Sequence, residues 1–167
     1  MTVIHTTWAS PSDPNYYDDN EYKRTLGDLM QRLRPVLVLD LHGSSPYRPY
    51  DVDIGTMNGD SLLGRERYQT DLVAALRQEG LTSLSGNYFS AARTETVTKF
   101  AASRGVPAIQ LEINATYLLL DEGNTTGELL SAQRFARLAQ ALTRYLLRFQ
   151  PSRTSETLAS EPAASGD

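Results

Sequence analysis

Two short apolar runs, each carrying a few polar residues toward its end, constrain the fold of this chain most strongly. The first covers residues 36–42 between Pro35 and Gly43, and the second covers residues 107–113. A short, continuous and partly β-branched apolar run is typical of a strand that is buried on both faces. We therefore expect both runs to be core strands of one sheet, with the first of them in a central position.

Segments with helical spacing of apolar residues separate these runs. The clearest is 128–149, where Phe135, Leu138, Leu142 and Leu146 follow the helical period. Helices are also predicted over residues 20–34, 61–79 and 93–104, and shorter strands over residues 3–8, 52–57 and 82–85. Because helices alternate with strands, we predict an α/β protein with a largely parallel sheet between layers of helices.

The length of the chain favours a single domain. Of 167 residues 40% are apolar, which is enough to build one core, and we expect residues 1–150 to form it. Residues 151–167 are rich in Ser, Ala, Glu and Pro, and such a composition predicts a disordered tail.

Composition and charge exclude several functions. The net charge is −4 without a basic stripe, which argues against nucleic-acid binding, and no apolar run is long enough for a membrane span. The absence of cysteine excludes a thiol nucleophile and a cysteine-based zinc site, and it favours the cytoplasm. The first residues do not resemble a signal peptide. The sequence also has no nucleophile elbow and no phosphate-binding glycine loop.

Polar residues on the two core strands are the best candidates for a functional site. Asp40 and His42 are two residues apart and therefore share a face of the first strand, as Gln110 and Glu112 do on the second. An ionised carboxylate in an apolar layer needs a partner, a metal ion or a cleft. Taken singly, His42 fits a hydrogen-bonded structural role and Glu112 a pairing with an arginine. Together, at the carboxyl ends of two core strands, they favour a ligand site.

The order of several motifs supports a more specific interpretation. Between residues 36 and 150 the chain resembles the N-formylglutamate amidohydrolase family. The resemblance is carried by Val38-Leu39-Asp40-Leu41-His42, Arg48, Asp53-Ile54-Gly55, Asn58-Gly59, Asn87-Tyr88-Phe89, Gln110-Leu111-Glu112-Ile113-Asn114 and Tyr117-Leu118.

The resemblance implies a three-layer α/β/α sandwich with a mixed sheet, related to zinc carboxypeptidases. It implies hydrolysis of a small linear amide, with N-formyl-L-glutamate giving formate and glutamate. His42 matches a zinc ligand of the family, and Glu112 matches the glutamate that activates zinc-bound water. Asp40 either orients the His42 imidazole or caps a loop.

The implied substrate is small and acidic. Arg48 is the candidate for holding its carboxylate, because a guanidinium forms a planar pair of donors. Asn58 and Arg93 are further candidates for the pocket. The alternative for Arg48 is a solvated side chain in a Pro/Tyr loop.

The sequence departs from the family in one respect. The resemblance implies two further zinc ligands in an H-x-x-E segment before the first core strand, but His5 is followed by Thr6, Thr7 and Trp8. We expect an N-terminally truncated enzyme with an incomplete zinc site. The alternatives are one half of a split protein, or a degenerate relative that binds an acidic small molecule without catalysis. A structural domain that uses the helix at 128–149 to hold a partner is a third class. The oligomeric state is not readable from the sequence.

Overall fold

The computed structural model describes residues 1–7, 13–17, 19–118 and 125–149. The predicted tail 151–167 lies outside the described residues. The elements in chain order are α1 (Glu21–Leu33), β1 (Val38–Ser44), β2 (Val52–Gly55), the 3₁₀ segment η1 (Met57–Leu62), α2 (Arg67–Gln78), β3 (Leu84–Gly86), α3 (Val97–Ala102), β4 (Ala108–Asn114), the 3₁₀ turn η2 (Ala115–Tyr117) and α4 (Thr125–Leu147).

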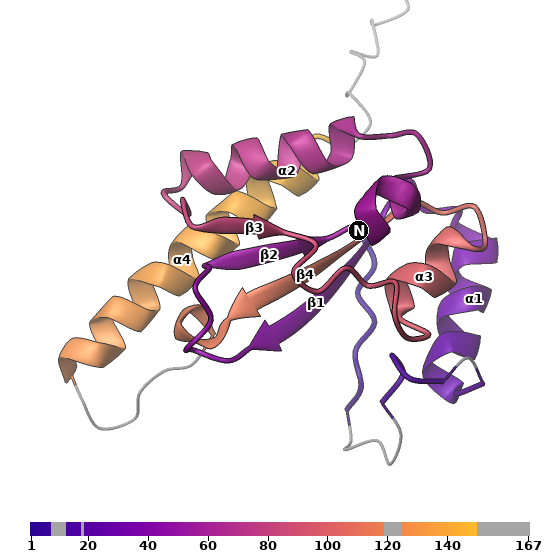
Figure 1. Cartoon of the computed structure of the whole chain (residues 1–167), viewed down its shortest axis with the longest axis horizontal. Helices are drawn as coiled ribbons and strands as arrows, with labels where there is room; N and C mark the ends of the chain where they lie inside the picture. The colour runs from indigo at the N-terminus through magenta and orange to yellow at the C-terminus, as the bar shows by residue number, and fades with distance from the viewer. Residues whose placement is uncertain (8–12, 18, 119–124, 150–167) are drawn as a thin grey trace, which may run out of the picture.

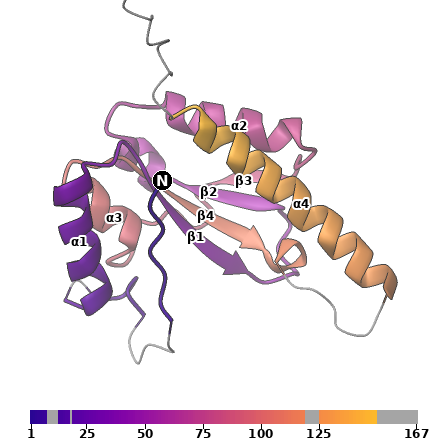
Figure 2. The same ribbon diagram turned by 180° about the vertical axis from the view of Figure 1, so that it is seen from behind.

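The described strands form one mixed sheet in the order β1-β4-β2-β3. β1 is parallel to β4 and β2 is parallel to β3, whereas β4 and β2 are antiparallel. Helices α2 and α4 lie on one face of the sheet, and α1 and α3 lie toward the other (Figures 1 and 2). The chain is therefore an α/β protein with a mixed, largely parallel sheet between helices, as the sequence predicts.

Two apolar clusters hold these layers together. The larger lies between the sheet and the pair α2/α4; its fully buried members include Ile54, Leu72 and Leu111. The smaller lies between α1, α3 and the start of β4, around Met30 and Phe100. Burial of apolar surface in these clusters supplies most of the favourable free energy of folding.

The central position predicted for the first core strand is wrong. Within the described residues β1 pairs only with β4 and forms an edge of the sheet. Leu41 is consequently 55% exposed, although its sequence context is as apolar as that of Leu111. An apolar run reports the hydrophobicity of a strand and does not reveal how many neighbours pair with it.

Two further elements differ from prediction. Residues 1–6 have no regular structure in place of the predicted strand, and only Ile4 among them is partly buried. The helix predicted from residue 61 begins at Arg67, because Leu63 and Gly64 both adopt positive φ and end the preceding 3₁₀ turn. Such backbone angles interrupt a helix.

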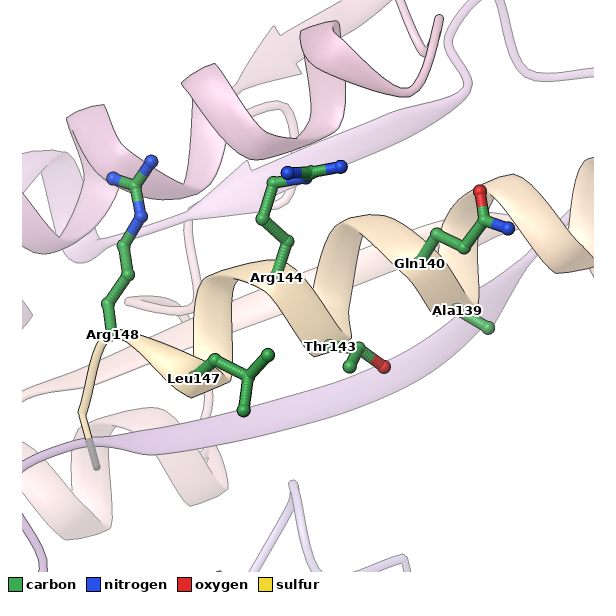
Figure 3. A pocket seen from close by; sticks show the side chains of 6 residues that line it. All are labelled: Ala139, Gln140, Thr143, Arg144, Leu147 and Arg148. Carbon is green, nitrogen blue, oxygen red and sulfur yellow. The ribbon is translucent and has the colours of Figure 1, made fainter. Parts of the chain in front are cut away.

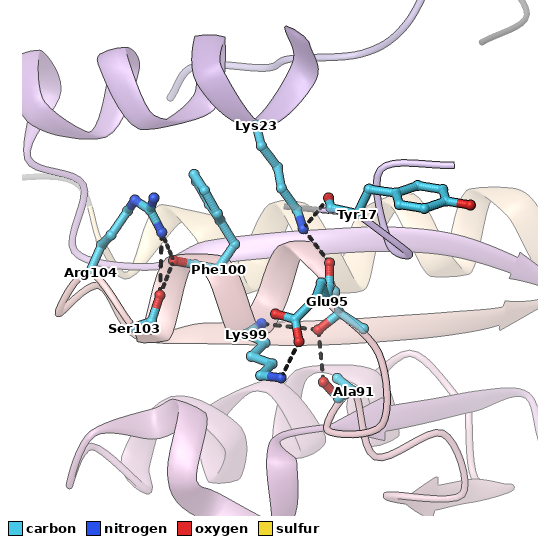
Figure 4. A network of polar contacts seen from close by, with 9 residues as sticks. Tyr17, Lys23, Ala91, Glu95, Lys99, Phe100, Ser103 and Arg104 are labelled. Carbon is cyan, nitrogen blue, oxygen red and sulfur yellow. Dashed lines mark hydrogen bonds and ion pairs between the residues drawn. The ribbon is translucent and has the colours of Figure 1, made fainter. Parts of the chain in front are cut away.

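A buried lysine joins α1 to the loop before α3. Lys23 is 0% exposed, and its Nζ donates to the carbonyl oxygens of Tyr17, at 2.7 Å, and Glu95 (Figure 4). The ammonium also lies 5.5 Å from the centre of the Phe100 ring. These contacts fix Tyr17 and the start of α1 beside α3, and Asn20 caps the helix by accepting from the Lys23 amide.

Candidate functional site

One face of the sheet carries a row of polar residues across three strands. His42 on β1 lies directly opposite Glu112 on β4, and Glu112 lies directly opposite Asp53 on β2. Residues opposite one another on paired strands point to the same face, and neighbouring strands are about 4.8 Å apart. His42, Glu112 and Asp53, which we call the polar row, therefore stand side by side.

The same face is apolar at one end and polar at the other. Val38 and Ala108, the first paired residues of β1 and β4, pack against the cluster of α1 and α3. Two residues further along, where Asp40 lies opposite Gln110, this face of each strand turns polar. Because side chains alternate between the two faces of a strand, these polar side chains lie on one face at the carboxyl ends of β1 and β4, where ligands bind in open α/β sheets.

His42 is positioned by Asp40 from the same strand. Its Nε2 lies 3.0 Å from Asp40 Oδ1, and the Asp40 side chain is only 8% exposed. Burial on its own lowers the pKa of the His42 imidazole. The carboxylates of Asp40 and Glu112 outweigh burial, and the net pKa of His42 is raised. Of the two roles predicted for Asp40, this contact supports orientation of the imidazole.

Glu112 is half-buried and held from its own strand. Gln110 Nε2 donates to Glu112 Oε1 at 3.0 Å. Burial raises the pKa of Glu112, while the positive charges of His42 and Arg48 act against that increase. A carboxylate with a raised pKa accepts a proton more readily, which suits a general base near neutral pH.

Arg48 comes from the loop between β1 and β2 and is brought to the same region. Its Nη1 donates to the Tyr88 hydroxyl at 2.9 Å, and its guanidinium lies 5.2 and 5.0 Å from the ring centres of Tyr88 and Phe89. Stacking on two rings restricts the guanidinium but leaves most of its donors available. Tyr88 links Arg48 to the polar row, because its hydroxyl accepts from Arg48 and its amide donates to Asp53 at 3.1 Å.

The loop that carries Arg48 is anchored by Asn114 at the end of β4. Asn114 is buried, and its Nδ2 donates to the carbonyl oxygens of Pro46, Arg48 and Tyr50 at 3.4, 3.2 and 3.1 Å. Its Oδ1 accepts from the amide of Thr116 at 3.0 Å. One amide side chain thereby fixes the loop relative to the polar row.

Asp53 is a functional candidate to which the sequence reasoning assigned no role. Its carboxylate is 0% exposed and accepts from the Ser85 hydroxyl and from the amides of Tyr88 and Phe89, at 3.1 and 2.8 Å. It therefore holds the aromatic loop against which Arg48 stacks. The sequence does contain a signal for Asp53, because this carboxylate lies between the apolar residues Val52 and Ile54. A carboxylate within an apolar strand was also the feature that identified Glu112.

Unsatisfied polar atoms concentrate around the polar row. Within the described residues, five buried side-chain atoms have no hydrogen-bond partner, and four of them are Asp40 Oδ2, His42 Nε2, Ser44 Oγ and Tyr50 Oη. His42 Nε2 nevertheless lies 3.0 Å from Asp40 Oδ1, and this contact contributes to the raised pKa of His42. Buried polar groups in proteins are nearly always paired, so this cluster indicates a place for a ligand or water.

The remaining predicted residues lie apart from these contacts. Asn58 is exposed in η1 with a φ of 58°, and its amide donates to Asn87 Oδ1 at 3.2 Å. Arg93 is exposed in the turn before α3. His5 is exposed near the N-terminus, with its Nδ1 3.3 Å from the carbonyl oxygen of Thr6.

The donor set does not complete a zinc site. Across the described part of the chain, no group of three or more His, Cys, Asp or Glu side chains is arranged to hold a metal ion. Catalytic zinc generally takes three protein ligands and a water molecule. The His42 imidazole, whose Nε2 lies 3.0 Å from Asp40, suits one ligand position, but the described residues do not supply the others.

A surface hollow on α4 offers a poorer site. It is lined by Ala139, Gln140, Thr143, Arg144 and Leu147 of α4 and by Arg148 just after the helix (Figure 3). Both arginines are paired, Arg144 with Glu79 at 2.7 Å and Arg148 with Asp71 at 2.9 Å. With its cations engaged and no titratable pair facing into it, the hollow lacks the chemistry of the polar row.

No protein-family model and no curated protein matches the chain. Among solved structures, N-formylglutamate amidohydrolase from Ralstonia eutropha JMP134 is similar, with 19% identity, a TM-score of 0.48, and coverage of 76% of this chain and 50% of that one. A metallo-carboxypeptidase from Burkholderia cenocepacia is similar with 20% identity, a TM-score of 0.48, and coverage of 77% and 35%. The apo form of an N-acetylmuramyl-L-alanine amidase from Mycobacterium abscessus is similar with 16% identity, a TM-score of 0.41, and coverage of 73% and 60%. The chain thus spans 50% of the length of the amidohydrolase.

None of the described helices combines the length and the hydropathy that crossing a bilayer requires.

Proposed function

We propose that the polar row belongs to an amidohydrolase site that cleaves the linear amide of a small N-acyl amino acid of the N-formylglutamate type. The observation that carries this proposal is the placement of His42 and Glu112 on one rung of the β1–β4 ladder, beside buried polar atoms that lack partners. The motif order that resembles the amidohydrolase family supports it. We further propose that the protein works in the cytoplasm, which the absence of cysteine favours.

Glu112 is the general base of this proposal. Its carboxylate takes a proton from a water molecule as the water oxygen attacks the amide carbon, and the proton passes to the departing nitrogen. The C–N bond breaks, and the products are a carboxylic acid and an amine, which for N-formyl-L-glutamate are formate and glutamate. Burial raises the pKa of Glu112 in the direction that this task requires.

Arg48 is proposed to bind a carboxylate of the substrate. Its guanidinium is held by Tyr88 and Phe89 and keeps free donors, so that it can form a paired contact with two carboxylate oxygens. Asn58 and Arg93 remain proposals as pocket residues, without a contact that ties them to the row.

Zinc is proposed as the cofactor, with His42 as one ligand. When bound, zinc would polarise the substrate carbonyl and acidify water. The described residues do not complete its coordination, and no step above depends on it.

The test is formate release from N-formyl-L-glutamate by the purified chain, assayed with added Zn²⁺ and with chelator. We expect release that is lost in Glu112→Gln and reduced in Arg48→Lys, because a lysine cannot reproduce the paired contact. Arg77→Lys is the matched control, since this exposed arginine lies on α2, which packs on the opposite face of the sheet from the polar row. Equal release by wild type and Glu112→Gln would exclude Glu112 as the base.

A non-catalytic binding module is the second candidate. The incomplete metal-ligand set among the described residues favours it. It predicts that N-formyl-L-glutamate raises the melting temperature without formate release, and that Arg48→Ala abolishes the increase. Formate release by the wild-type chain that Glu112→Gln removes would exclude this candidate.

A further inference from the structure

We propose that the hydroxyl groups of Ser44 and Tyr50 form an oxygen-binding subsite that donates two hydrogen bonds to the carbonyl oxygen of the scissile amide. This inference rests on the proposed function for the identity of the ligand. The existence of the subsite rests on the structure of the chain alone.

Both residues are placed beside Glu112 by the strands. Ser44 lies on the same face of β1 as His42 and opposite Asn114, two residues beyond Glu112. Tyr50 follows in the loop, where Asn114 Nδ2 donates to its carbonyl oxygen at 3.1 Å. Asn114 therefore fixes the approach of Tyr50 to the carboxyl ends of β1 and β4.

The Tyr50 side chain is buried and directed into this region. It is 3% exposed, and its ring centre lies 5.8 Å from that of Tyr88, the residue that accepts from Arg48. Burial raises the pKa of Tyr50, a contact with Ser44 lowers it, and the charges of Asp53 and Glu112 raise it again, so that the net pKa lies above its ordinary value. Tyr50 therefore remains a neutral donor at physiological pH.

Neither hydroxyl has a partner of good geometry. Ser44 Oγ and Tyr50 Oη are both among the buried atoms without a hydrogen bond of good geometry. Among the described residues the two hydroxyls can contact only each other, and this contact lowers the pKa of Tyr50 but does not satisfy both groups. A buried hydroxyl without a hydrogen-bond partner lowers the stability of the fold by about 1–3 kcal/mol. Two such hydroxyls in one place therefore indicate a position where a ligand atom can accept hydrogen bonds from both.

The neighbouring charges decide which oxygen fits. Glu112 lies close enough to raise the pKa of Tyr50, and it would repel a second carboxylate. A neutral carbonyl oxygen accepts from two hydroxyl donors without that repulsion. During amide hydrolysis this oxygen becomes more negative as water adds to the carbon, and donors already in place stabilise that charge. The subsite thus complements Glu112, which activates the water.

The experiment uses variants that remove only the hydroxyl oxygen, Tyr50→Phe and Ser44→Ala. We compare thermal unfolding without ligand, and we titrate N-formyl-L-glutamate by calorimetry. Without ligand, both variants are expected to unfold at or above the wild-type temperature, because an unsatisfied group has been removed. The affinity for N-formyl-L-glutamate is expected to fall about tenfold in each, as for the loss of one hydrogen bond.

Two control variants separate burial from ligand contact. Tyr145→Phe removes a buried hydroxyl that donates to the Tyr68 carbonyl at 3.0 Å, and it should lower the melting temperature without changing affinity. Thr98→Val removes a buried hydroxyl in α3 that also lacks a partner, and it should leave affinity unchanged.

A loss of stability in Tyr50→Phe as large as in Tyr145→Phe would overturn the subsite, because the hydroxyl would then have a partner in the protein. Unchanged affinity in both subsite variants would overturn it as well. If the wild type does not respond to N-formyl-L-glutamate, the proposed function fails, and a crystal structure decides the subsite. A water oxygen within hydrogen-bonding distance of both hydroxyls supports it, whereas hydroxyls paired with protein groups exclude it.

Discussion

Asp53 and Glu112 lie directly opposite each other on antiparallel strands, yet only one of the two carboxylates is sealed in the protein. Asp53 is fully buried and accepts from Ser85, Tyr88 and Phe89. Glu112 is partly exposed, and within the described residues its carboxylate accepts a hydrogen bond only from Gln110. We interpret Asp53 as the carboxylate that builds the loop and Glu112 as the carboxylate left for chemistry, because a base must be able to exchange a proton.

The first prediction concerns the cost of placing Glu112 in this position. Its pKa is raised mainly by burial, so the folded state holds the proton more tightly than the unfolded state. Stability therefore falls as the pH rises through the ordinary glutamate range and stays lower above it. Glu112→Gln should unfold at a higher temperature than wild type at pH 7–8, and the difference should vanish near pH 4, close to the ordinary pKa of about 4.3.

The control for that variant is Glu66→Gln, which changes an exposed glutamate at the start of α2. It should alter the melting temperature little at either pH. A Glu112→Gln protein that is less stable than wild type at neutral pH would show that His42 and Arg48 more than compensate for burial.

The second prediction concerns Asp53. Asp53→Asn keeps the shape but replaces one carboxylate oxygen by an NH2 group that then faces the backbone N–H of Tyr88 or Phe89, and we expect a loss of about 3 kcal/mol in the free energy of unfolding. Urea titration measures the change. Asp60→Asn, an exposed position in η1, should fall within about 0.5 kcal/mol of wild type. If Asp53→Asn changes the free energy of unfolding as little as Asp60→Asn, Asp53 does not hold the aromatic loop.

Much of the fold follows from the sequence because local signals and tertiary structure agree. The helix predicted at 20–34 forms as Glu21–Leu33, and the two core runs form β1 and β4 as parallel neighbours. The prediction of a central position for β1 was wrong, because the place of a strand in a sheet depends on long-range pairing. The prediction for the start of α2 was wrong because the spacing of apolar residues does not show that Leu63 adopts a positive φ.

The relative placement of the candidate residues was predictable where the alternation of side chains on a strand determines the face on which they lie. Asp40, His42 and Glu112 come together because register and period place them on the same side. Arg48 reaches them only through a loop whose course depends on Asn114, and Tyr50 follows the same loop. Loop paths of this kind have no periodic signal, so Tyr50 was not identified and Asn58 and Arg93 had no geometric support.

The third prediction tests this dependence on Asn114. Asn114→Asp retains the oxygen that accepts from Thr116 but replaces the donor to Pro46, Arg48 and Tyr50 by an acceptor. Repulsion between the new oxygen and three carbonyls should cost about 2–3 kcal/mol and open the loop.

Hydrogen exchange in residues 45–51 should then accelerate more than in β2 or α2. Asn58→Asp is the matched control, because this exposed residue tolerates the same change at its positive φ. Exchange that accelerates uniformly over the whole chain would indicate general destabilisation in place of a released loop.

The last prediction concerns alkaline pH and the packing of α4. Burial raises the pKa of Tyr145, and the negative charge of Asp71 raises it further. The unfolded chain ionises this tyrosine above its ordinary pKa of about 10, whereas the folded chain keeps it neutral, so stability is complete below that pH and declines above it. Urea unfolding between pH 8 and pH 11 should show the decline.

The variant Tyr145→Phe should have a free energy of unfolding about 1 kcal/mol lower than wild type at pH 8, because it lacks the hydrogen bond to the Tyr68 carbonyl, but its stability should decline less steeply with pH. Part of the slope should remain, because burial also raises the pKa values of Tyr50 and Tyr117. Equal slopes in wild type and variant would mean that Tyr145 is free to ionise in the folded protein, and that its hydroxyl is not enclosed between α2 and α4.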